Sequence, residues 1–353
     1  MGKRVTIKDI AAEAGVSTGT VHRALYGKKG VSSALQEKIL DICVRREYQA
    51  NTAAAALKRR SLRIVGAFPV PDGKGRFFYS NVWKGFRRCI QELRDYNIEE
   101  IEIAYSEEDP QAQSAELLSC FRRYDGAIDG LVTVGPFSDA GMQALQVYTE
   151  RGVPVFLACD DRSECGRLAC AQADHERTGR MVAELLTSQL RPGDTILLCG
   201  GDVLRPSHAQ TVHGFEEYLR AHAPDIGLLT LYGYGNEADL RTRLQEALLH
   251  RSDIAGAFSV SARLSVLLAN EAEALNKSNS IRIVASDLFE ETVRNMERGI
   301  VKNIVYKAPE QQAYLATKLL GDYVLKGWKP ASDIQYVESR LIFQSDLDVY
   351  KNR

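Results

Sequence analysis

The first residues in the chain whose types and spacing suit a chemical task lie between positions 18 and 25. Val21 and Leu25 stand four positions apart, so on a helix both would face inward. The opposite face then carries Thr18, Gly19, His22 and Arg23. An arginine can hold a guanine edge through two hydrogen bonds, while hydroxyl and imidazole groups can reach bases or phosphates. This pattern predicts a helix that reads DNA from the major groove.

Presenting that face requires two short helices that cross tightly. Thr6 and Asp9 have the spacing of a capping box at the start of the first helix. The apolar stripe of this helix is narrow and comprises Ile10, Ala11 and Ala14. Gly15 fits the left-handed turn that ends the helix, and Ser17 can cap the second one. The spacing therefore predicts a helix-turn-helix, followed by a third helix.

Charge is distributed unevenly along the chain. Residues 1–60 contain twelve Lys or Arg and five Asp or Glu, a net charge of +7. Subtracting these from the chain totals of 45 and 46 leaves 33 basic and 41 acidic residues, a net charge of −8. A basic head on an acidic body attracts phosphates and releases counterions from DNA.

The same N-terminal stretch resembles the lactose-repressor (LacI/GalR) family of bacterial transcription regulators. The match covers residues 5–57 and rests on Thr6–Ala11, Gly15–Ser17, Thr20–Val21 and Arg23, which fall in the family's register. The resemblance implies DNA contacts at ten positions: Thr6, Ser17, Thr18, Gly19, Thr20, His22, Arg23, Asn51, Ala54 and Leu57. It also implies a near-palindromic double-stranded operator that a homodimer binds.

Three of those positions, Asn51, Ala54 and Leu57, match the hinge helix of the family. In the family this leucine wedges into the central minor-groove step from each half of the dimer and kinks the duplex. Ordinary helix packing is the alternative role for Leu57. His22 and Tyr26 replace the family's usual serine and asparagine, so the operator sequence stays open.

The remaining 290 or so residues are enough for two packed α/β subdomains. Helix-like segments alternate with strand-like ones, a pattern typical of parallel sheets covered by helices on both faces. The expected strands are Leu62–Phe68, Glu100–Ala104, Gly130–Val134, Val153–Ala158, Arg167–Gln172, Thr195–Cys199, Gly227–Tyr232, Gly256–Val260 and Ile281–Ala285. The predicted fold class is α/β, with an all-α helix-turn-helix head and hinge helix followed by two doubly wound parallel-sheet subdomains.

This body resembles the periplasmic-binding-protein type 1 sensor fold over residues 62–343. The resemblance implies three chain crossings between two hinged subdomains, with a small effector between them. We expect a DNA-binding domain at 1–49, a hinge helix and linker at 50–61, and an effector domain at 62–353. Its N-subdomain would comprise about 62–164 plus 306–331, and its C-subdomain about 165–305 plus 332–353.

Candidate effector contacts lie near the ends of the expected strands, where ligands of open α/β sheets bind. They are Phe77, Phe78, Asp160, Asp161, Arg205, Thr211, Ser261, Asp287 and Lys307. The aromatic pair could stack on a sugar or belong to the core. Asp287 could accept paired hydroxyls, and Lys307 could attract a sugar acid or phosphate ester or simply be solvated. Thr211 and Ser261 stand where the family commonly has arginine and asparagine, which weakens the case for an unmodified sugar.

An enzyme built on the α/β body is the alternative function. Gly200–Asp202 after a strand is a weak phosphate-loop signal, and Ser207 with His208 could form a nucleophile and base. However, the chain has neither a G-x-x-x-x-G-K-[ST] loop nor a G-x-S-x-G elbow. We therefore expect a transcription regulator that acts as a repressor, with no catalytic residue, cofactor or metal.

Cysteine usage and hydropathy limit where the protein works. The seven cysteines form no paired C-x-x-C pattern, which predicts buried free thiols in a reducing cytoplasm. No apolar run approaches the ~20 residues of a membrane span, and the N-terminus is a basic capped helix rather than a signal peptide. We expect a cytoplasmic homodimer whose partners are DNA and a carbohydrate-derived effector, with no membrane association.

The basic head predicts a steep salt dependence of operator binding. If six or more phosphates are neutralised, affinity should fall by about 10³-fold or more between roughly 50 and 200 mM salt. Fluorescence anisotropy of a labelled operator, titrated with the full chain at several salt concentrations, measures this slope. A flat dependence of affinity on salt would contradict the role given to the basic head.

Overall fold

The N-terminal unit is a three-helix head. The structure is a computed structural model and describes residues 5–25, 30–46 and 61–351. The helices are α1 (Ile7–Ala14), α2 (Thr18–Leu25) and α3 (Ser33–Arg45). Their shared core comprises Ile10, Ala11, Ala14, Val21, Ala24, Ile39, Ile42 and Cys43. The predicted helix-turn-helix and third helix are therefore confirmed.

Local hydrogen bonds explain why these short helices begin and end where they do. The Thr6 amide donates to Asp9 Oδ2 at 2.7 Å, and the Asp9 amide donates to Thr6 Oγ1 at 3.4 Å. This capping box satisfies amides that the first turn of α1 leaves without helical partners. Gly15 ends α1 at φ +71°, and Ser17 Oγ accepts the Thr20 amide at 3.2 Å at the start of α2.

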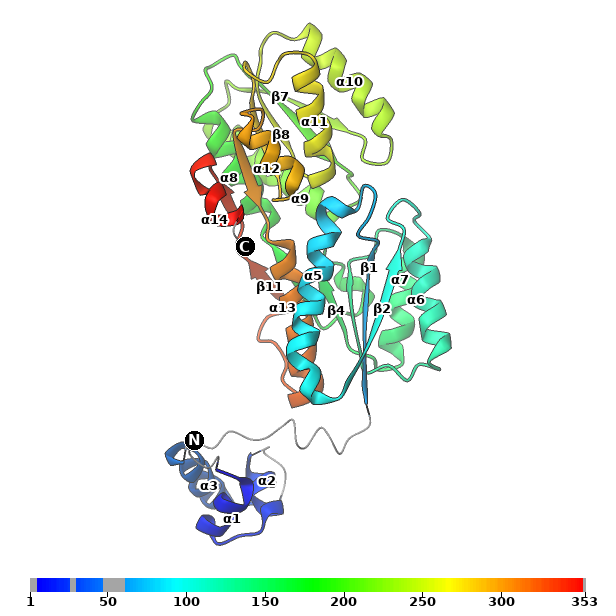
Figure 1. Cartoon of the computed structure of the whole chain (residues 1–353), viewed down its shortest axis with the longest axis vertical. Coiled ribbons are helices and arrows are strands. Elements are labelled where there is room, and N and C mark those ends of the chain that lie inside the picture. Colours follow the sequence, from blue (N-terminus) through cyan, green and yellow to red (C-terminus); the bar gives the residue numbers. More distant parts are fainter. Residues whose placement is uncertain (1–4, 26–29, 47–60, 352–353) are drawn as a thin grey trace. The chain divides into compact units, whose positions relative to one another are not determined.

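The first lobe of the body is built on six parallel strands in the order β11, β5, β4, β3, β1, β2. These strands are β1 (Leu62–Pro69), β2 (Ile98–Tyr105), β3 (Gly130–Val134), β4 (Val155–Ala158), β5 (Ala169–Ala173) and β11 (Ile334–Val337). Its helices are α5 (Arg76–Leu93), α6 (Ala112–Arg123), α7 (Asp139–Glu150) and α13 (Pro309–Lys326), with short 3-10 turns η1 (Arg94–Tyr96) and η2 (Ser163–Cys165). Figure 1 shows α5 and α13 on one side of the sheet and α6 and α7 on the other.

The second lobe repeats this plan, with the strand order β12, β10, β9, β8, β6, β7. Its strands are β6 (Thr195–Gly201), β7 (Gly227–Tyr232), β8 (Ile254–Ser259), β9 (Arg282–Ser286), β10 (Asn303–Tyr306) and β12 (Arg340–Ile342). Its helical segments are α8 (His175–Thr187), α9 (Pro206–His222), α10 (Glu237–His250), α11 (Ala262–Ala274), α12 (Glu290–Glu297), η3 (Gln344–Asp346) and α14 (Leu347–Lys351). The edge strand β12 pairs antiparallel with β10, and the other pairs are parallel.

Alternation along β6 shows why helices cover both faces of this sheet. Ile196 and Leu198 belong to the core under α8 and α9, whereas Leu197 and Cys199 belong to the core under α10 and α11. Successive strand side chains point to opposite faces, so a strand buried on both sides must be apolar throughout. The predicted class of two doubly wound parallel sheets is confirmed.

The chain crosses between the lobes three times, after β5, after β10 and after β11. Two strands therefore lie in a different lobe from the one expected. Ala169–Ala173 pairs with β4, and Ile334–Val337 pairs with β5, so both belong to the first sheet. The sequence prediction assigned them to the C-subdomain. An apolar run predicts a strand but says nothing about which of two similar sheets it joins.

All seven cysteines are buried and free, as predicted. Burial raises the pKa of the Cys199 thiol to about 12 and keeps it neutral. Within the part of the chain that the structure describes, no helix combines the length and apolar character that crossing a membrane requires.

Helices α8 and α9 approach each other closely through two glycines. A Cβ atom on Gly179 would lie 2.1 Å from the carbonyl oxygen of Thr211, and one on Gly214 would lie 2.1 Å from that of Glu176. Only glycine fits at both positions, because any side chain would clash with backbone. This contact fixes α9, whose N-terminus faces the first lobe.

Gly214→Ala should therefore destabilise the body by about 1–3 kcal/mol, as overpacking does. Alanine has the higher helix propensity by about 1 kcal/mol, so a net loss of stability can come only from the close approach. Urea unfolding measures the change. Gly235→Ala is the matched control, since a Cβ there meets nothing within 4 Å. Equal stability of the two variants would refute the role of this contact.

Candidate DNA interface and ligand cleft

The head presents the predicted recognition face on α2. Thr18, Gly19 and Arg23 are exposed, whereas Val21 is fully buried. The Arg23 guanidinium donates to Thr20 Oγ1 at 3.2 Å, one helical turn earlier. This bond holds the guanidinium along the outer face of the helix, where its remaining N–H groups can meet a base edge.

Several predicted DNA contacts lie outside the described residues. They are the side chain of His22 and the hinge residues Asn51, Ala54 and Leu57, together with Tyr26. Thr6 and Ser17 are exposed at the N-termini of α1 and α2, where backbone amides can also bind phosphate. All ten DNA contacts stay predictions.

A small cavity lies between the two lobes at the carboxyl ends of their strands. Its volume is about 40 Å³, room for a few waters. It is lined by Lys74, Gly75, Phe77, Phe78, Tyr79, Glu107, Asp160, Arg205, His208, Tyr234, Ser261, Ala262, Arg263 and Lys307. A ligand as large as a sugar would need the lobes to stand further apart than they do in this conformation.

A buried ion pair among the lining residues of this cavity joins the two lobes. Arg205, which precedes α9, places Nη1 2.8 Å from Oε1 of Glu107, which follows β2. The two side chains are only 8% and 6% exposed. The same carboxylate oxygen accepts the hydroxyls of Tyr79 at 3.1 Å and Tyr234 at 2.9 Å. Three donors from two lobes thus converge on one oxygen atom.

Aromatic rings complete the environment of this arginine. Its guanidinium carbon lies 4.0 Å from the ring centre of Phe137 in the first lobe and 4.5 Å from that of Tyr234 in the second. Such cation–π contacts are stronger when water is excluded. Arg205 is therefore held by both lobes at once.

A second link between the lobes caps a helix. Asp160 follows β4 in the first lobe, and its Oδ1 accepts the Ser207 amide of α9 at 2.9 Å. A carboxylate at a helix N-terminus satisfies an amide and interacts favourably with the helix dipole. Because Asp160 is 6% exposed, little solvent screens this contact.

Charged pairs also cross the rim of the cleft. Lys74 of the first lobe lies 3.2 Å from Glu237 of the second, and Arg263 of the second lobe lies 3.7 Å from Glu108 of the first. Lys74 and Glu108 are about half or more exposed, so these pairs contribute less than the buried one.

The second chain crossing is braced by a carboxylate. Asp287 follows β9 with φ +64° and is fully buried. Its Oδ1 accepts the Lys307 amide at 2.9 Å, and its Oδ2 lies 3.3 Å from Lys307 Nζ. Lys307 Nζ also donates to the carbonyl of Val260 at 2.9 Å. The contacts of both side chains therefore stabilise the crossing.

The structure sorts the predicted effector residues into two groups. Those that line the cavity are Phe77, Phe78, Asp160, Arg205, Ser261 and Lys307. Those that do not are Asp161, Thr211 and Asp287. Asp161 pairs with the buried Arg167 at 2.7 Å, and Thr211 Oγ1 donates to the Ser207 carbonyl at 2.7 Å. The Asp287 carboxylate contacts Lys307 in this conformation, and its contact with a ligand stays a prediction.

Sequence reasoning missed Tyr79, Glu107, Tyr234 and Arg263. Glu107 and Tyr234 each stand two residues beyond a parallel strand, β2 and β7 respectively. The rule that ligand groups follow the carboxyl ends of strands could have found both.

Phe77, one of the predicted residues, also contacts the opposite lobe, since its ring centre lies 5.0 Å from that of Phe289.

The residues considered for catalysis have structural partners. His208 Nδ1 accepts the Asp202 amide at 3.1 Å, so that ring atom supports the loop before α9. The Ser207 amide serves Asp160, and its carbonyl accepts Thr211. Among the described residues, the Ser207 hydroxyl makes no hydrogen bond to His208.

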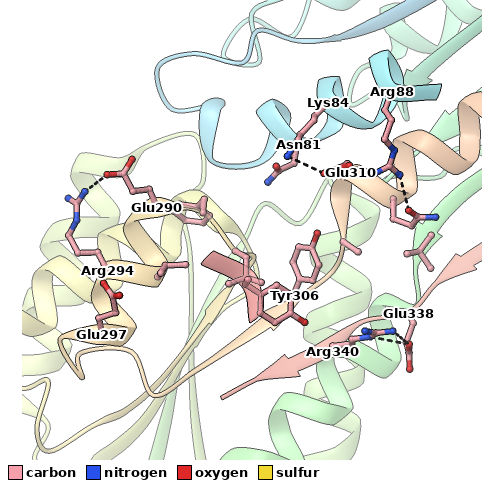
Figure 2. Close-up of a pocket in the computed structure, with 17 residues that line it drawn as sticks. Asn81, Lys84, Arg88, Glu290, Arg294, Glu297, Tyr306, Glu310, Glu338 and Arg340 are labelled. Carbon is pink, nitrogen blue, oxygen red and sulfur yellow. Dashed lines mark hydrogen bonds and ion pairs between the residues drawn. The ribbon is translucent and has the colours of Figure 1, made fainter. Parts of the chain in front are cut away.

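A larger groove of about 1100 Å³ lies elsewhere on the body (Figure 2). Lys84 and Arg88 of α5 and Glu310 of α13 lie on one side, and Glu290, Arg294 and Glu297 of α12 lie on the other. Its charges pair with their neighbours: Arg88 with Glu310, Arg294 with Glu290, and Arg340 with Glu338. These arginines are 43–63% exposed, so the groove is a solvated surface, unlike the buried charges of the cleft.

Burial shifts two histidines toward the neutral form, His208 in the cleft and His175 at the start of α8. It lowers the pKa of His208 well below the usual 6.5, and the charges of Arg205 and Lys307 lower it further. Burial also lowers the pKa of His175, whose Nε2 lies 3.0 Å from the Cys159 carbonyl.

Family models match both parts of the chain. The model for bacterial regulatory proteins of the lacI family matches residues 6–51, and that for the periplasmic binding protein domain matches residues 66–327. Among curated relatives, catabolite control protein A of Staphylococcus epidermidis is 24% identical over 258 residues, which cover 70% of this chain and 74% of the relative. The protein of the same name from Staphylococcus xylosus is 22% identical over 258 residues, which again cover 70% of this chain and 74% of the relative.

Solved structures share the fold of the body. A LacI transcriptional regulator from Bacteroides fragilis superposes with a TM-score of 0.70 at 18% identity, over 82% of this chain and 100% of that one. A solute binding protein from Burkholderia graminis, in complex with D-arabinose, gives a TM-score of 0.72 at 15% identity, over 82% of this chain and 97% of that one. At these identities the structures establish the fold alone.

A capped helix-turn-helix joined to a two-lobed periplasmic-binding-protein fold defines a class of DNA-binding transcription regulators. The chain belongs to the lacI family of bacterial regulatory proteins and is homologous to catabolite control protein A.

The buried histidines predict a loss of stability in mild acid. Their folded-state pKa values lie below the unfolded value of 6.5, so below about pH 6.5 the unfolded chain binds protons that the folded chain does not. Their contribution is complete above that pH. The free energy of unfolding should fall by up to about 1.4 kcal/mol per pH unit for each histidine as the pH falls toward their folded-state values.

Urea unfolding between pH 8 and pH 5.5 or so measures this slope. His208→Gln should flatten it, and the exposed His250→Gln is the control that should leave it unchanged. If His208→Gln kept the slope of the unmodified chain, neutral burial of His208 would be disproved.

Proposed function

We propose that this chain is a ligand-controlled repressor that acts as a homodimer on a near-palindromic operator in the cytoplasm. One observation carries the proposal: a recognition helix with an exposed Arg23 is part of the same chain as two lobes that are joined by buried polar contacts. The first feature binds DNA, and the second changes conformation when a ligand separates or joins the lobes.

The DNA half of the mechanism depends on two copies of the head. Each copy would place α2 in the major groove of one half-site, with Arg23 toward a guanine edge. The hinge segments at residues 50–61 would order against each other in the minor groove, where Leu57 from each copy enters the central base step.

The ligand half uses the cleft. The solved relatives of this fold include binding proteins in complex with D-arabinose and with α-D-tagatopyranose. The cleft of this chain combines aromatic rings, carboxylates and cations, a composition that suits a carbohydrate-derived effector. Phe77, Phe78, Asp160, Arg205 and Ser261 are the proposed contacts.

Ligand and operator would be linked through the spacing of the lobes. A ligand shifts the equilibrium by its difference in affinity for the open and closed conformations, and the operator must then alter ligand affinity by the same factor. The three chain crossings move with the lobes, so a change at the cleft alters the surfaces that hold the dimer and pair the hinges.

The test uses operators selected by the full chain from random double-stranded DNA. The selected sites should be near-palindromic, and sedimentation should give two chains per duplex. Leu57→Ala should lower the affinity for the operator by about tenfold or more and reduce the bend of the DNA. The reason is that insertion of Leu57 into the base step bends the duplex and so permits more contacts between protein and DNA. Anisotropy gives affinity, and energy transfer between labelled DNA ends gives the bend.

Leu40→Ala is the matched control for that variant. Leu40 lies on α3 in the head, is 42% exposed, and is not among the proposed contacts. It should leave affinity and bend unchanged. Unchanged affinity and bend in Leu57→Ala would remove the wedge, and non-palindromic sites bound by single chains would overturn the dimer.

A further inference from the structure

We propose that the effector of this cleft is a polyhydroxylated anion. Its carboxylate or phosphate group binds Arg205 and Arg263 on the second lobe, and its hydroxyls bind Glu107 and Asp160 on the first. The inference rests on the proposed function and specifies the chemistry of the ligand for the same site.

The buried carboxylates and the buried arginines of the cavity lie on opposite walls. Both carboxylates that line it, Glu107 and Asp160, come from the first lobe, after β2 and β4. The second lobe contributes Arg205 and Arg263, and it also directs the N-terminus of α9 at Asp160. The first-lobe wall also carries Lys74, which is about half exposed and whose ammonium group pairs with Glu108 and Glu237 at the rim. Away from that rim, a ligand between the walls meets carboxylates on one side and guanidinium groups on the other.

In this conformation, protein carboxylates bind both Arg205 and the N-terminus of α9. Glu107 lies 2.8 Å from Arg205, and Asp160 accepts the Ser207 amide at 2.9 Å. A ligand that separates the lobes pulls these carboxylates away from their partners. Leaving one member of a buried ion pair without a counter-charge is strongly unfavourable. An anionic group on the ligand restores the counter-charge to Arg205, and ligand hydroxyls can donate to the freed carboxylates.

Arg263 adds a second guanidinium to the same wall. It is 8% exposed, and its guanidinium carbon lies 5.1 Å from the ring centre of Tyr234, the ring that Arg205 also contacts. Its carboxylate partners are Glu237 at 3.3 Å and the more exposed Glu108 at 3.7 Å. Two arginines around one tyrosine ring favour an anion, because planar guanidinium groups match carboxylate and phosphate oxygens in pairs.

The side chains that line the cavity carry a net positive charge. The cations are Lys74, Arg205, Arg263 and Lys307, and the anions are Glu107 and Asp160. Lys307 does not hold the anion, since its ammonium group serves Asp287 and the Val260 carbonyl. A neutral sugar could offer only hydroxyls to Arg205 and Arg263, and hydrogen bonds between two ionised groups are the stronger ones.

The test is calorimetric titration of the full chain with sugar acids, sugar phosphates and their neutral parents. The probes are D-gluconate, D-galactonate, D-glucuronate and D-glucose 6-phosphate, compared with D-glucose, D-galactose and sorbitol. At least one polyhydroxylated anion should bind about tenfold or more tightly than its neutral parent. The carboxylates and the phosphate ester distinguish the two sources of the anionic group. Acetate and inorganic phosphate, which lack the hydroxyls, should bind weakly.

Variants locate the anionic group. Arg263→Gln should remove the preference for the anion over its neutral parent, and Arg263→Lys should restore part of it. Arg282→Gln, at an exposed arginine of β9 in the second lobe, is the matched control and should change nothing. Thermal unfolding of each variant shows whether it is folded.

The outcomes separate this inference from the proposed function. A neutral sugar that binds as tightly as its acid, or an anion preference that survives Arg263→Gln, overturns the inference and leaves the regulator intact. Simple anions that bind as well as the sugar acids overturn the requirement for hydroxyls. If none of the carbohydrates binds, a carbohydrate-derived effector is refuted, and this inference falls with it.

Discussion

A single guanidinium group, buried between the two lobes, has partners on both of them. Arg205 has this position, with Glu107 and Phe137 on one side and Tyr234 on the other. Removing the partner of a buried charge typically costs about 3–5 kcal/mol. The closed arrangement of the lobes depends on this contact, because only closure brings Glu107 to the arginine. The small size of the cavity and the Asp160 cap on α9 follow from the same closure.

The chain crossings connect the position of the lobes at the cleft to the surfaces of the body outside it. Asp287 and Lys307 brace the second crossing, and Thr178 and Ser339 share a 2.8 Å hydrogen bond where the first and third crossings meet. These contacts hold the three crossing segments together between the lobes. In the proposed mechanism, ligand exchange at Arg205 therefore moves both lobes as packed units, and the dimer surfaces move with them.

Local signals were predictable from the sequence, and contacts between distant segments were not. The types and spacing of Thr6, Asp9 and Gly15 predicted the first helix of the head, because helix caps and turns depend on residues a few positions apart. Glu107 and Tyr234 meet only because two separate strands end at one cleft, and β5 joined the first sheet through pairing that apolar patterning cannot specify. Asp287 was expected near the ligand because it follows a strand, and its bond with the Lys307 amide, twenty residues further along the chain, could not be read from the sequence.

The most direct test of the central claim is the distance between the lobes, measured by pulsed electron resonance on spin labels. Cysteines introduced for labelling at Glu116 of α6 and Glu246 of α10 are exposed, one on each lobe, while the native thiols are buried. We expect one short distance for the otherwise unmodified chain and a broader, longer distribution when Glu107→Gln removes the counter-charge of Arg205. Identical distributions for the two proteins would contradict the account.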